Sequence, residues 1–327
     1  DGEGVLGIGD QGIGAIDISI GKLMVYTVCA GIDPNRVLPI VLDVGTNNQK
    51  LLDDPMYLGW RHKRLKDKEY DDFIDLFVTS VRKNLPGVYL HWEDFGRDNA
   101  RKNLNRYRDQ MCTFNDDMQG TGIVATANVL TASDVAGLDL KDHRVVVLGA
   151  GTAGCGITDQ ICDAVFHSGV DKDTARKQFW LVDRNGLLVS DQADLVEFQK
   201  PYARDRSELS DWEIKDASNI TLAEVVSHVK PTILIGCSTV HGAFTEEIVK
   251  DMCAHCDVPI IMPLSNPTSK SEAEPKDLIH WSDGKALVAA GSPFDPVDYK
   301  GRKIRISQRN NAFVFPVLGL GVIASKA

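Results

Sequence analysis

Short apolar runs, rich in β-branched residues, recur along the chain and alternate with longer and more polar stretches. Each run has the length of a buried strand. They lie at residues 37–42 (VLPIVL), 88–91 (VYLH), 144–148 (RVVVL), 178–182 and 232–236.

A different spacing marks the stretch from Tyr70 to Lys83. Its apolar side chains recur every three or four residues, at Phe73, Ile74, Phe77, Val78 and Val81. This period predicts an amphipathic helix. Strands alternating with helices predict an α/β fold, mainly parallel, with binding sites at the carboxyl ends of strands.

Three glycine-rich runs are candidates for binding a dinucleotide, at residues 7–12 (GIGDQG), 149–154 (GAGTAG) and 319–321. Only the second follows an apolar strand-like run directly and opens a helix-like stretch. Its glycines can turn tightly, admit a pyrophosphate and pack closely, with a helix N-terminus facing the phosphates. A Rossmann-type doubly wound sheet is therefore predicted, with a plain glycine turn as the alternative.

Asp183 ends the next strand-like run, FWLVD, where a carboxylate accepts hydrogen bonds from ribose hydroxyls. This favours NAD as the cofactor. The aspartate lies 29 residues after Gly154, more than the usual ~20, and neighbouring Arg184 could instead bind the 2′-phosphate of NADP.

Charge and cysteine content exclude several classes of protein. The net charge is −10, from 36 basic and 46 acidic residues, so no basic footprint for nucleic acid is expected. Seven cysteines form no regular disulfide framework, which fits a reducing cytoplasm. We expect no membrane span, because no uninterrupted apolar run approaches ~18 residues.

Two acidic pairs lie where a parallel sheet would place ligands. Glu93 and Asp94 follow the run VYLHW, and Asp116 and Asp117 lie in TFNDDMQGTG. Together they can supply the oxygen ligands that Mn²⁺ or Mg²⁺ prefers. The alternative is that they are ordinary surface acids.

Lys22, in SIGKL, is a candidate general base if a nearby cation lowers its pKa. Otherwise it is a solvated lysine on a helix. The CAHC run at residues 253–256 has no second ligand pair at a suitable spacing, so we expect free thiols there rather than a zinc or redox site.

A set of motifs in fixed order resembles the malic enzyme family over nearly the whole chain. They are GVLGIGDQG (4–12), SIGKL (19–23), LDVGTNN (42–48), HWEDFGRDNA (91–100), TFNDDMQGTG (113–122), SNPTSKSEA (265–273) and QRNNAFVFPVLGLG (308–321).

The resemblance implies malate as the substrate and roles for particular residues. Glu93, Asp94 and Asp117 would ligate the metal, Lys22 would be the acid and base for the substrate hydroxyl, and Asp116 would lie beside that lysine. Asn266 and Asn310 would hold the dicarboxylate, with Asn311 as a second choice. The NAD-binding residues would be Gly149, Gly151, Thr152, Ala153, Gly154, Asp183 and Asn266.

Position 4 directs the chain to the malolactic branch of this family. Malic enzymes typically have a substrate-binding arginine there, whereas this chain has Gly4 after Glu3, as malolactic enzymes do. The runs LHWEDFGR and GAGTAGCGI also resemble that branch. We therefore expect malate to be converted to lactate and CO₂, with an NAD-dependent malic enzyme giving pyruvate and NADH as the alternative. An inactive nucleotide-binding module is a further alternative.

The resemblance also implies a segment upstream of Asp1, bearing a catalytic tyrosine and dimer-forming helices, so a homo-oligomer is expected when that segment is present. The motifs place a substrate and metal domain at residues 1–115, to which 311–327 return. A dinucleotide domain would span residues 116–310.

Overall fold

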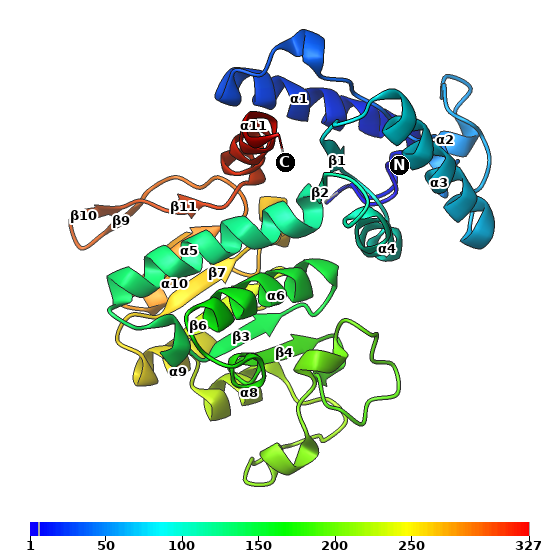
Figure 1. The fold of residues 1–327 in the computed structure, drawn as a ribbon. Coiled ribbons are helices and arrows are strands. Elements are labelled where there is room, and N and C mark those ends of the chain that lie inside the picture. The colour runs from blue at the N-terminus through cyan, green and yellow to red at the C-terminus, as the bar shows by residue number, and fades with distance from the viewer. Residues whose placement is uncertain (6, 327) are drawn as a thin grey trace. The chain divides into compact units, whose positions relative to one another are not determined.

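The computed structural model describes residues 1–5 and 7–326. The chain forms two compact units: Asp1–Gly120 with Asn311–Ala327, and Thr121–Asn310. The domain limits expected from the sequence remain a prediction. The α/β fold class is confirmed, and Figure 1 follows its elements along the chain.

The first unit is mostly helical, with a short sheet of two parallel strands. Its elements are η1 (Gly12–Ala15), α1 (Ile16–Ala30), η2 (Pro34–Arg36), α2 (Gln49–Asp53), α3 (Asp67–Asn84), β1 (Leu90–Trp92), α4 (Arg97–Tyr107), β2 (Thr113–Asn115), the π-helical turn η3 (Asp116–Gly120), η8 (Asn311–Phe313) and α11 (Phe315–Ser325).

The predicted helix at residues 70–83 lies within α3, which buries Tyr70, Ile74, Val78 and Val81 on one face. The strand predicted at 37–42 is wrong, because these residues belong to no strand or helix. Pro39 interrupts this run and cannot donate a hydrogen bond to a neighbouring strand. Its apolar residues Leu38 and Ile40 are exposed, and only Leu42 is buried.

The second unit is built on one seven-stranded sheet, in the order β11-β8-β7-β6-β3-β4-β5. All neighbouring strands are parallel except β4 and β5. The strands are β3 (Val145–Leu148), β4 (Phe179–Asp183), β5 (Gly186–Leu187), β6 (Ile233–Gly236), β7 (Ile260–Pro263), β8 (Leu287–Ala290) and β11 (Ser307–Gln308), beside a separate hairpin of β9 (Val297–Tyr299) and β10 (Arg302–Ile304).

The remaining elements of this unit are helices and short turns. They are α5 (Thr121–Ala136), η4 (Leu140–Asp142), α6 (Thr152–His167), α7 (Lys172–Arg176), η5 (Lys200–Tyr202), η6 (Arg206–Leu209), α8 (Leu222–Val229), α9 (Glu246–His255), η7 (Thr268–Lys270) and α10 (Pro275–Trp281).

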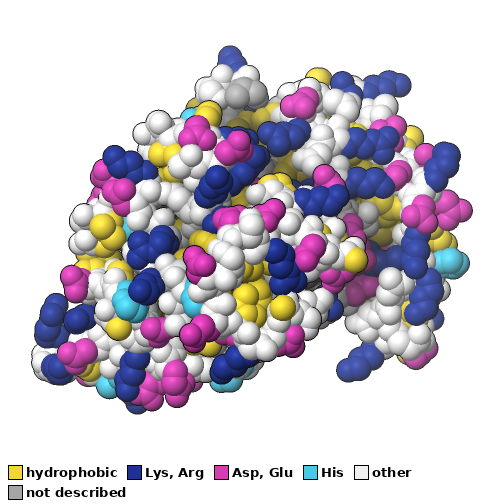
Figure 2. Space-filling model, turned by 90° about the horizontal axis from the view of Figure 1, so that it is seen from below, with side chains coloured by type: hydrophobic (Ala, Val, Ile, Leu, Met, Phe, Trp, Pro, Cys, Tyr) yellow, Lys and Arg dark blue, Asp and Glu magenta, His cyan; other side chains and the backbone are white. Residues whose placement is uncertain are grey.

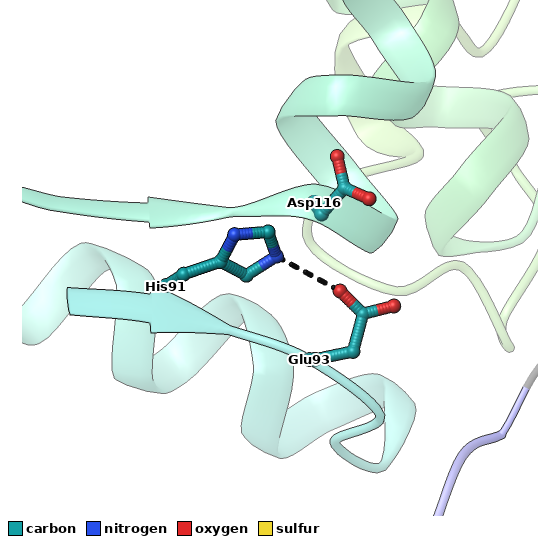
Figure 3. A group of neighbouring side chains, drawn as sticks. All are labelled: His91, Glu93 and Asp116. Carbon is teal, nitrogen blue, oxygen red and sulfur yellow. Dashed lines mark hydrogen bonds and ion pairs between the residues drawn. The ribbon is translucent and has the colours of Figure 1, made fainter. Parts of the chain in front are cut away.

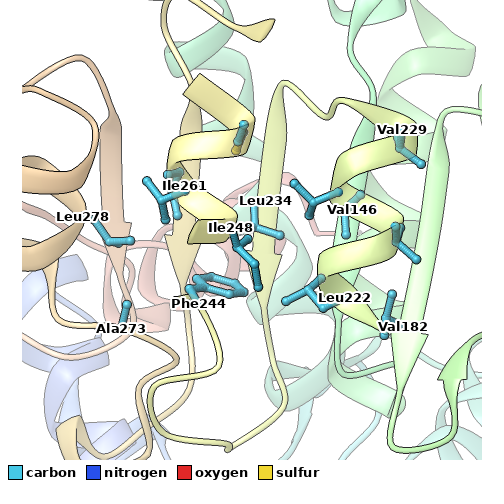
Figure 4. Packing of buried hydrophobic residues seen from close by; sticks show 14 of the residues in the cluster. Val146, Val182, Leu222, Val229, Leu234, Phe244, Ile248, Ile261, Ala273 and Leu278 are labelled. Atoms are coloured by element: carbon cyan, nitrogen blue, oxygen red, sulfur yellow. The ribbon is translucent and has the colours of Figure 1, made fainter. Parts of the chain in front are cut away.

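Alternation along the strands divides the core of this unit between the two faces of its sheet. Val145 and Val147 of β3 pack with residues of α5 and α6, whereas Val146 packs with residues of α8, α9 and α10. Figure 4 shows this second cluster, with Leu234 of β6 beside Ile248 of α9. The order of strands reverses at β3, so β3 and β6 flank a switch point at which such sheets bind ligands.

One helical stretch passes a length and composition test for a membrane span. The stretch Gly12–Ala30 is 19 residues long and has a mean hydropathy of 1.5, and only 11% of its apolar window is buried. We did not expect this from the sequence, because Asp17 and Lys22 interrupt the apolar run. The Lys22 ammonium lies 2.8 Å from the Glu93 carboxylate, which favours a helix packed within its unit over a span.

On the face of the molecule drawn in Figure 2, basic side chains lie among acidic ones. All seven cysteines are free thiols. Those of the CAHC run take part in neither of the two clusters of possible metal ligands found among the described residues.

Candidate active site

Two acidic pairs emerge together from the small sheet of the first unit. β1 pairs in parallel with β2, with Trp92 opposite Asn115. Glu93 and Asp94 directly follow the first strand, and Asp116 and Asp117 directly follow the second. Because parallel strands end at the same edge, both pairs reach one place.

Asp94 has a backbone conformation that few non-glycine residues adopt. Its φ is +58°, which costs about 1 kcal/mol or more. Its backbone N–H donates to Oδ2 of Asp117 at 2.9 Å. Its own Oδ2 is buried and has no hydrogen-bond partner among residues 1–5 and 7–326. The strained turn thus holds a buried carboxylate oxygen that is available to a ligand.

Glu93, Asp94 and Asp117, here called the acidic trio, each offer one oxygen within 4.8 Å of the other two. Burial is the largest cause that raises the pKa of each acid to about 7; neighbouring carboxylates add to it, and for Glu93 and Asp117 the Lys22 ammonium partly offsets it. A group of buried carboxylates that repel one another fits a hard divalent cation such as Mn²⁺ or Mg²⁺. The unpaired oxygen of Asp94 supports that fit.

A second group of possible ligands shares one member with the trio. His91, Glu93 and Asp116 also offer atoms within 4.8 Å of one another, and Figure 3 shows how they lie. However, His91 Nε2 lies 2.9 Å from Glu93 Oε2 and its Nδ1 lies 2.8 Å from the Tyr26 hydroxyl. Both ring nitrogens are engaged, so the all-oxygen trio is the better cation site.

Lys22, on α1, points its ammonium at these carboxylates. Nζ lies 2.8 Å from Glu93 Oε1, contacts the Asp116 carboxylate, and lies 4.9 Å from the ring centre of Phe315. Burial alone would lower the pKa of Lys22, but Glu93 and Asp116 raise it above its ordinary value. With no cation at the trio, Lys22 is therefore an ammonium. This is opposite to the shift expected beside a bound cation.

Asp116 is the most enclosed of these acids. Its side chain is fully buried, and its Oδ1 has no hydrogen-bond partner in the part of the chain that the structure describes. The side-chain amide of Asn311 donates to its backbone carbonyl at 2.9 Å. Of the neighbours Asn310 and Asn311, the second choice, Asn311, thus lies at this site, whereas Asn310 is exposed and belongs to the second unit.

The glycine-rich loop follows β3 and leads into α6. A Cβ at Gly149, whose φ is +99°, would lie 2.5 Å from the backbone of Cys237, and one at Gly154 would lie 1.9 Å from the Gly149 carbonyl oxygen. These glycines therefore let the loop pack against neighbouring backbone. Gly151 is the N-cap of α6, followed by Thr152 and Ala153. The buried Thr152 hydroxyl has no partner within the described ranges, which suits a phosphate acceptor.

Asp183 ends β4, the neighbour of β3 in the sheet. Its Oδ2 accepts a hydrogen bond of 3.4 Å from the side-chain amide of Gln199, which also donates to the Ala150 carbonyl at 2.8 Å. The side chain of Arg184 is exposed. Asp183 is thus tied to the glycine loop by a shared glutamine.

Asn266 follows β7 at the same edge of the sheet. Its Oδ1 accepts a hydrogen bond of 2.6 Å from the Ser292 hydroxyl. The preceding residue, Ser265, donates to the buried carboxyl group of Glu272. The carboxyl ends of β3, β4 and β7 therefore present Gly149, Asp183 and Asn266 on one edge of the second unit.

The sequence pattern did not identify His91, which contacts Glu93, or Tyr26, which contacts His91. One signal was available for His91. It precedes Glu93 by two residues on a strand, and side chains at that spacing point to the same face. Nothing in the sequence pattern places Tyr26 beside them.

The fold is that of an α/β protein with a dinucleotide-type sheet. The family model for the malic enzyme N-terminal domain matches residues 1–108, and the model for the malic enzyme NAD-binding domain matches residues 118–327. The chain therefore belongs to the malic enzyme family.

Two relatives agree with this assignment. The chain is 56% identical to NAD-dependent malic enzyme 3 of Bacillus subtilis and 53% identical to an NAD-dependent malic enzyme of Sodalis glossinidius, with 100% of this chain and 58% of each relative covered. The chain thus spans little more than half the length of these relatives.

Two solved structures match this chain at 24% identity. The NAD-dependent malic enzyme of Thermotoga maritima matches with a TM-score of 0.72, and the malic enzyme of Entamoeba histolytica matches with a TM-score of 0.71. The matches cover 100% of this chain, with 71% of the first structure and 57% of the second. They support the fold.

Proposed function

We propose that this chain forms the catalytic part of an NAD-dependent enzyme that oxidises and decarboxylates malate to pyruvate, CO₂ and NADH. The observation that carries the proposal is the acidic trio beside the pair formed by Lys22 and Asp116. The names of the relatives that are 52–56% identical favour pyruvate as the product over the lactate expected from the sequence.

Glu93, Asp94 and Asp117 would hold Mn²⁺ or Mg²⁺. When bound, such a cation polarises the oxygen of the substrate's C2 and stabilises the charge that develops as CO₂ leaves. Glu93 also supplies the largest of the negative charges that keep Lys22 protonated, ahead of Asp116 and Asp117. Lys22 Nζ would accept the proton of the substrate hydroxyl, a role that a lower pKa would favour if the charge of Glu93 were shared with a cation.

Asp116 would hold the Lys22 amine in place through the cycle. The proton that Nζ takes from the substrate hydroxyl would then pass to the enolate product, at its carbon or at its oxygen. Within the first unit Asn311 would bind a substrate carboxylate, a role that the sequence resemblance gives first to Asn266 and Asn310. The loop of Gly149, Gly151, Thr152, Ala153 and Gly154 would hold the pyrophosphate at the N-terminus of α6. Asp183 and Asn266 would bind the remainder of NAD. The exposed side chain of Arg184 does not contradict the choice of NAD over NADP.

A second candidate, the malolactic reaction, is favoured by Gly4. A Cβ there would lie 2.5 Å from the Phe95 carbonyl oxygen, so this backbone would have to shift to admit the arginine that typically binds substrate in malic enzymes. A site without that arginine would keep its intermediate and its reduced cofactor bound. The hydride would then return before release and give lactate with no net redox change.

Product analysis decides between these reactions. The full-length protein is given malate, NAD⁺ and Mn²⁺, and pyruvate, lactate and NADH are followed together. Pyruvate with stoichiometric NADH is expected, whereas lactate without NADH would establish the malolactic reaction.

The same assay tests the role of Lys22. Lys22→Ala should lower kcat by about 10²–10⁴-fold, the usual contribution of a general acid or base. A variant that keeps full activity, or a wild-type protein that binds NAD and Mn²⁺ without consuming malate, would leave only a nucleotide-binding module. We further propose a cytoplasmic protein that forms a homo-oligomer in its full-length form.

A further inference from the structure

His91 is a buried histidine that the proposed mechanism does not use. Its Nε2 lies 2.9 Å from Glu93 Oε2 and its Nδ1 lies 2.8 Å from the Tyr26 hydroxyl. The side chains of His91 and Glu93 are only 13% and 11% exposed. Figure 3 shows the imidazole of His91, on β1, turned toward the glutamate, which lies two residues further along the chain.

The partners of the ring define the direction of these hydrogen bonds. The carboxylate of Glu93 is paired with the Lys22 ammonium through Oε1, so its Oε2 can only accept, and His91 Nε2–H donates to it. Nδ1 then accepts from the Tyr26 O–H, since a neutral imidazole has one donor and one acceptor. The result is an ordered relay from Tyr26 through His91 to Glu93.

Aromatic neighbours fix the plane of this imidazole. Its ring centre lies 5.4 Å from that of Phe114, 5.7 Å from Phe315 and 5.8 Å from Tyr26, all in edge-to-face orientations. A ring held on these sides presents its Nε2–H in one direction. Rotation of the glutamate would therefore break a hydrogen bond that has no alternative orientation.

We propose that His91, oriented by Tyr26, is a positioning residue that fixes the carboxylate of Glu93 for cation binding. Oε2 of Glu93 is held by His91, and Oε1 lies 2.8 Å from the Lys22 ammonium. The histidine thereby sets the orientation in which Glu93 meets the cation. This inference rests on the cation site of the proposed function.

The alternative is that His91 is itself a ligand, in the group with Glu93 and Asp116. Ligation through either nitrogen would break one of its two hydrogen bonds. Hard divalent cations such as Mg²⁺ also prefer oxygen to imidazole nitrogen. The geometry therefore favours a role through Glu93.

The test measures Mn²⁺ binding by the full-length protein, from the electron paramagnetic resonance signal of free Mn²⁺. His91→Ala should raise the Kd for Mn²⁺ by about 10-fold or more, as removal of hydrogen-bond partners of metal ligands does. His91→Gln, whose side-chain amide can donate near the position of Nε2, should restore most of the affinity. Tyr26→Phe should give a smaller loss.

His143 supplies a matched control. It is also buried and bonded at both nitrogens, to Thr232 and Ser133 at 2.8 Å each, but it lies in the second unit. His143→Gln should leave the Kd for Mn²⁺ unchanged. In activity assays, the His91 variants should need more Mn²⁺ for half-maximal rate, with kcat at saturating Mn²⁺ within about 3-fold of the wild type.

Wild-type binding reports on the proposed cation site, and the variants report on His91. If the wild type binds Mn²⁺ but His91→Ala and His91→Gln bind it equally well, the positioning role is wrong. If both variants lose binding as completely as Asp94→Asn, His91 is a ligand and the positioning role is again wrong. Should His91→Ala fail to fold, as judged by its thermal unfolding without metal, His91→Gln and Tyr26→Phe still decide the question.

Discussion

Buried carboxyl groups occur in both units and are held in opposite ways. Glu272, with 0% of its surface exposed, accepts four hydrogen bonds from the backbone and hydroxyl groups of Ser238 and Ser265. The acidic trio has few such donors, and burial raises the pKa of its members to about 7. A carboxyl group that accepts hydrogen bonds from its own chain holds loops together, whereas carboxyl groups with few donors, grouped within a few ångströms, form the site at which we propose that a cation binds.

Removing one acid of the trio should have the largest effect. Asp94→Asn should weaken Mn²⁺ binding by more than about 100-fold, because a direct ligand contributes more than the 10–100-fold of an outer partner. Calorimetric titration with Mn²⁺ measures this. Glu272→Gln is the control and should bind Mn²⁺ normally. Equal losses in the two variants would show that the contrast between these regions is wrong.

Glu272→Gln should instead lower the free energy of unfolding, by about 2–3 kcal/mol. An amide cannot accept at both of its ends, so at least one buried donor of Ser238 or Ser265 is left unpaired. Urea denaturation of the metal-free protein measures the change. Asp94→Asn, measured alongside at pH 8, should cause no such loss, because it relieves repulsion. A Glu272 variant as stable as the wild type would refute the structural role of this carboxyl group.

The next largest difference between the two regions should be in how stability depends on pH. The folded pKa of about 7 for the trio exceeds the ordinary values of 3.8 and 4.5, so between these values the folded state binds more protons than the unfolded state. This contribution to stability is complete below pH ~4 and is lost as pH rises through 7.

Thermal unfolding of the metal-free protein should therefore give a lower Tm at pH 8 than at pH 6. Added Mn²⁺ should raise the Tm more at pH 8, because the cation binds deprotonated acids. In Asp94→Asn the decline without metal should be smaller. A Tm that rises between pH 6 and pH 8 without metal would contradict the repulsion described for the trio.

The smallest effect is expected from a single donor to Glu272. Ser265→Ala removes one hydroxyl and leaves three of the four hydrogen bonds, so the free energy of unfolding should fall by about 1 kcal/mol. Urea denaturation beside Glu272→Gln gives the comparison. A loss as large as that of Glu272→Gln would mean that this one hydroxyl, rather than the whole set of donors, holds the carboxyl group.

The second unit could be predicted well because its signals are local. The runs at residues 144–148, 178–182 and 232–236 became β3, β4 and β6, and a glycine motif directly after the first of them led into a helix. Apolar strands buried on both faces need no long-range information to be recognised. The run at residues 37–42 failed because composition suggested a strand while Pro39 prevented one.

The candidate site of the first unit depends on contacts that no local pattern carries. The sequence placed both acidic pairs after apolar runs, but only the pairing of β1 with β2 brings Glu93 to Asp117. The left-handed turn at Asp94 and the π-helical turn after β2 have no sequence signal that we used. The contact of Tyr26 with His91 joins residues 65 positions apart, which explains why the relay to Glu93 went unnoticed.

Gly4 has a consequence for how such a site can change over generations. Its N–H donates to the Asp94 carbonyl at 3.3 Å, and the Phe95 carbonyl oxygen occupies the space that any side chain at position 4 would need. A single mutation to arginine would therefore meet backbone rather than solvent, and would disturb the turn that holds Asp94. Exchange between glycine and arginine at this position therefore requires the segment around Phe95 to move as well.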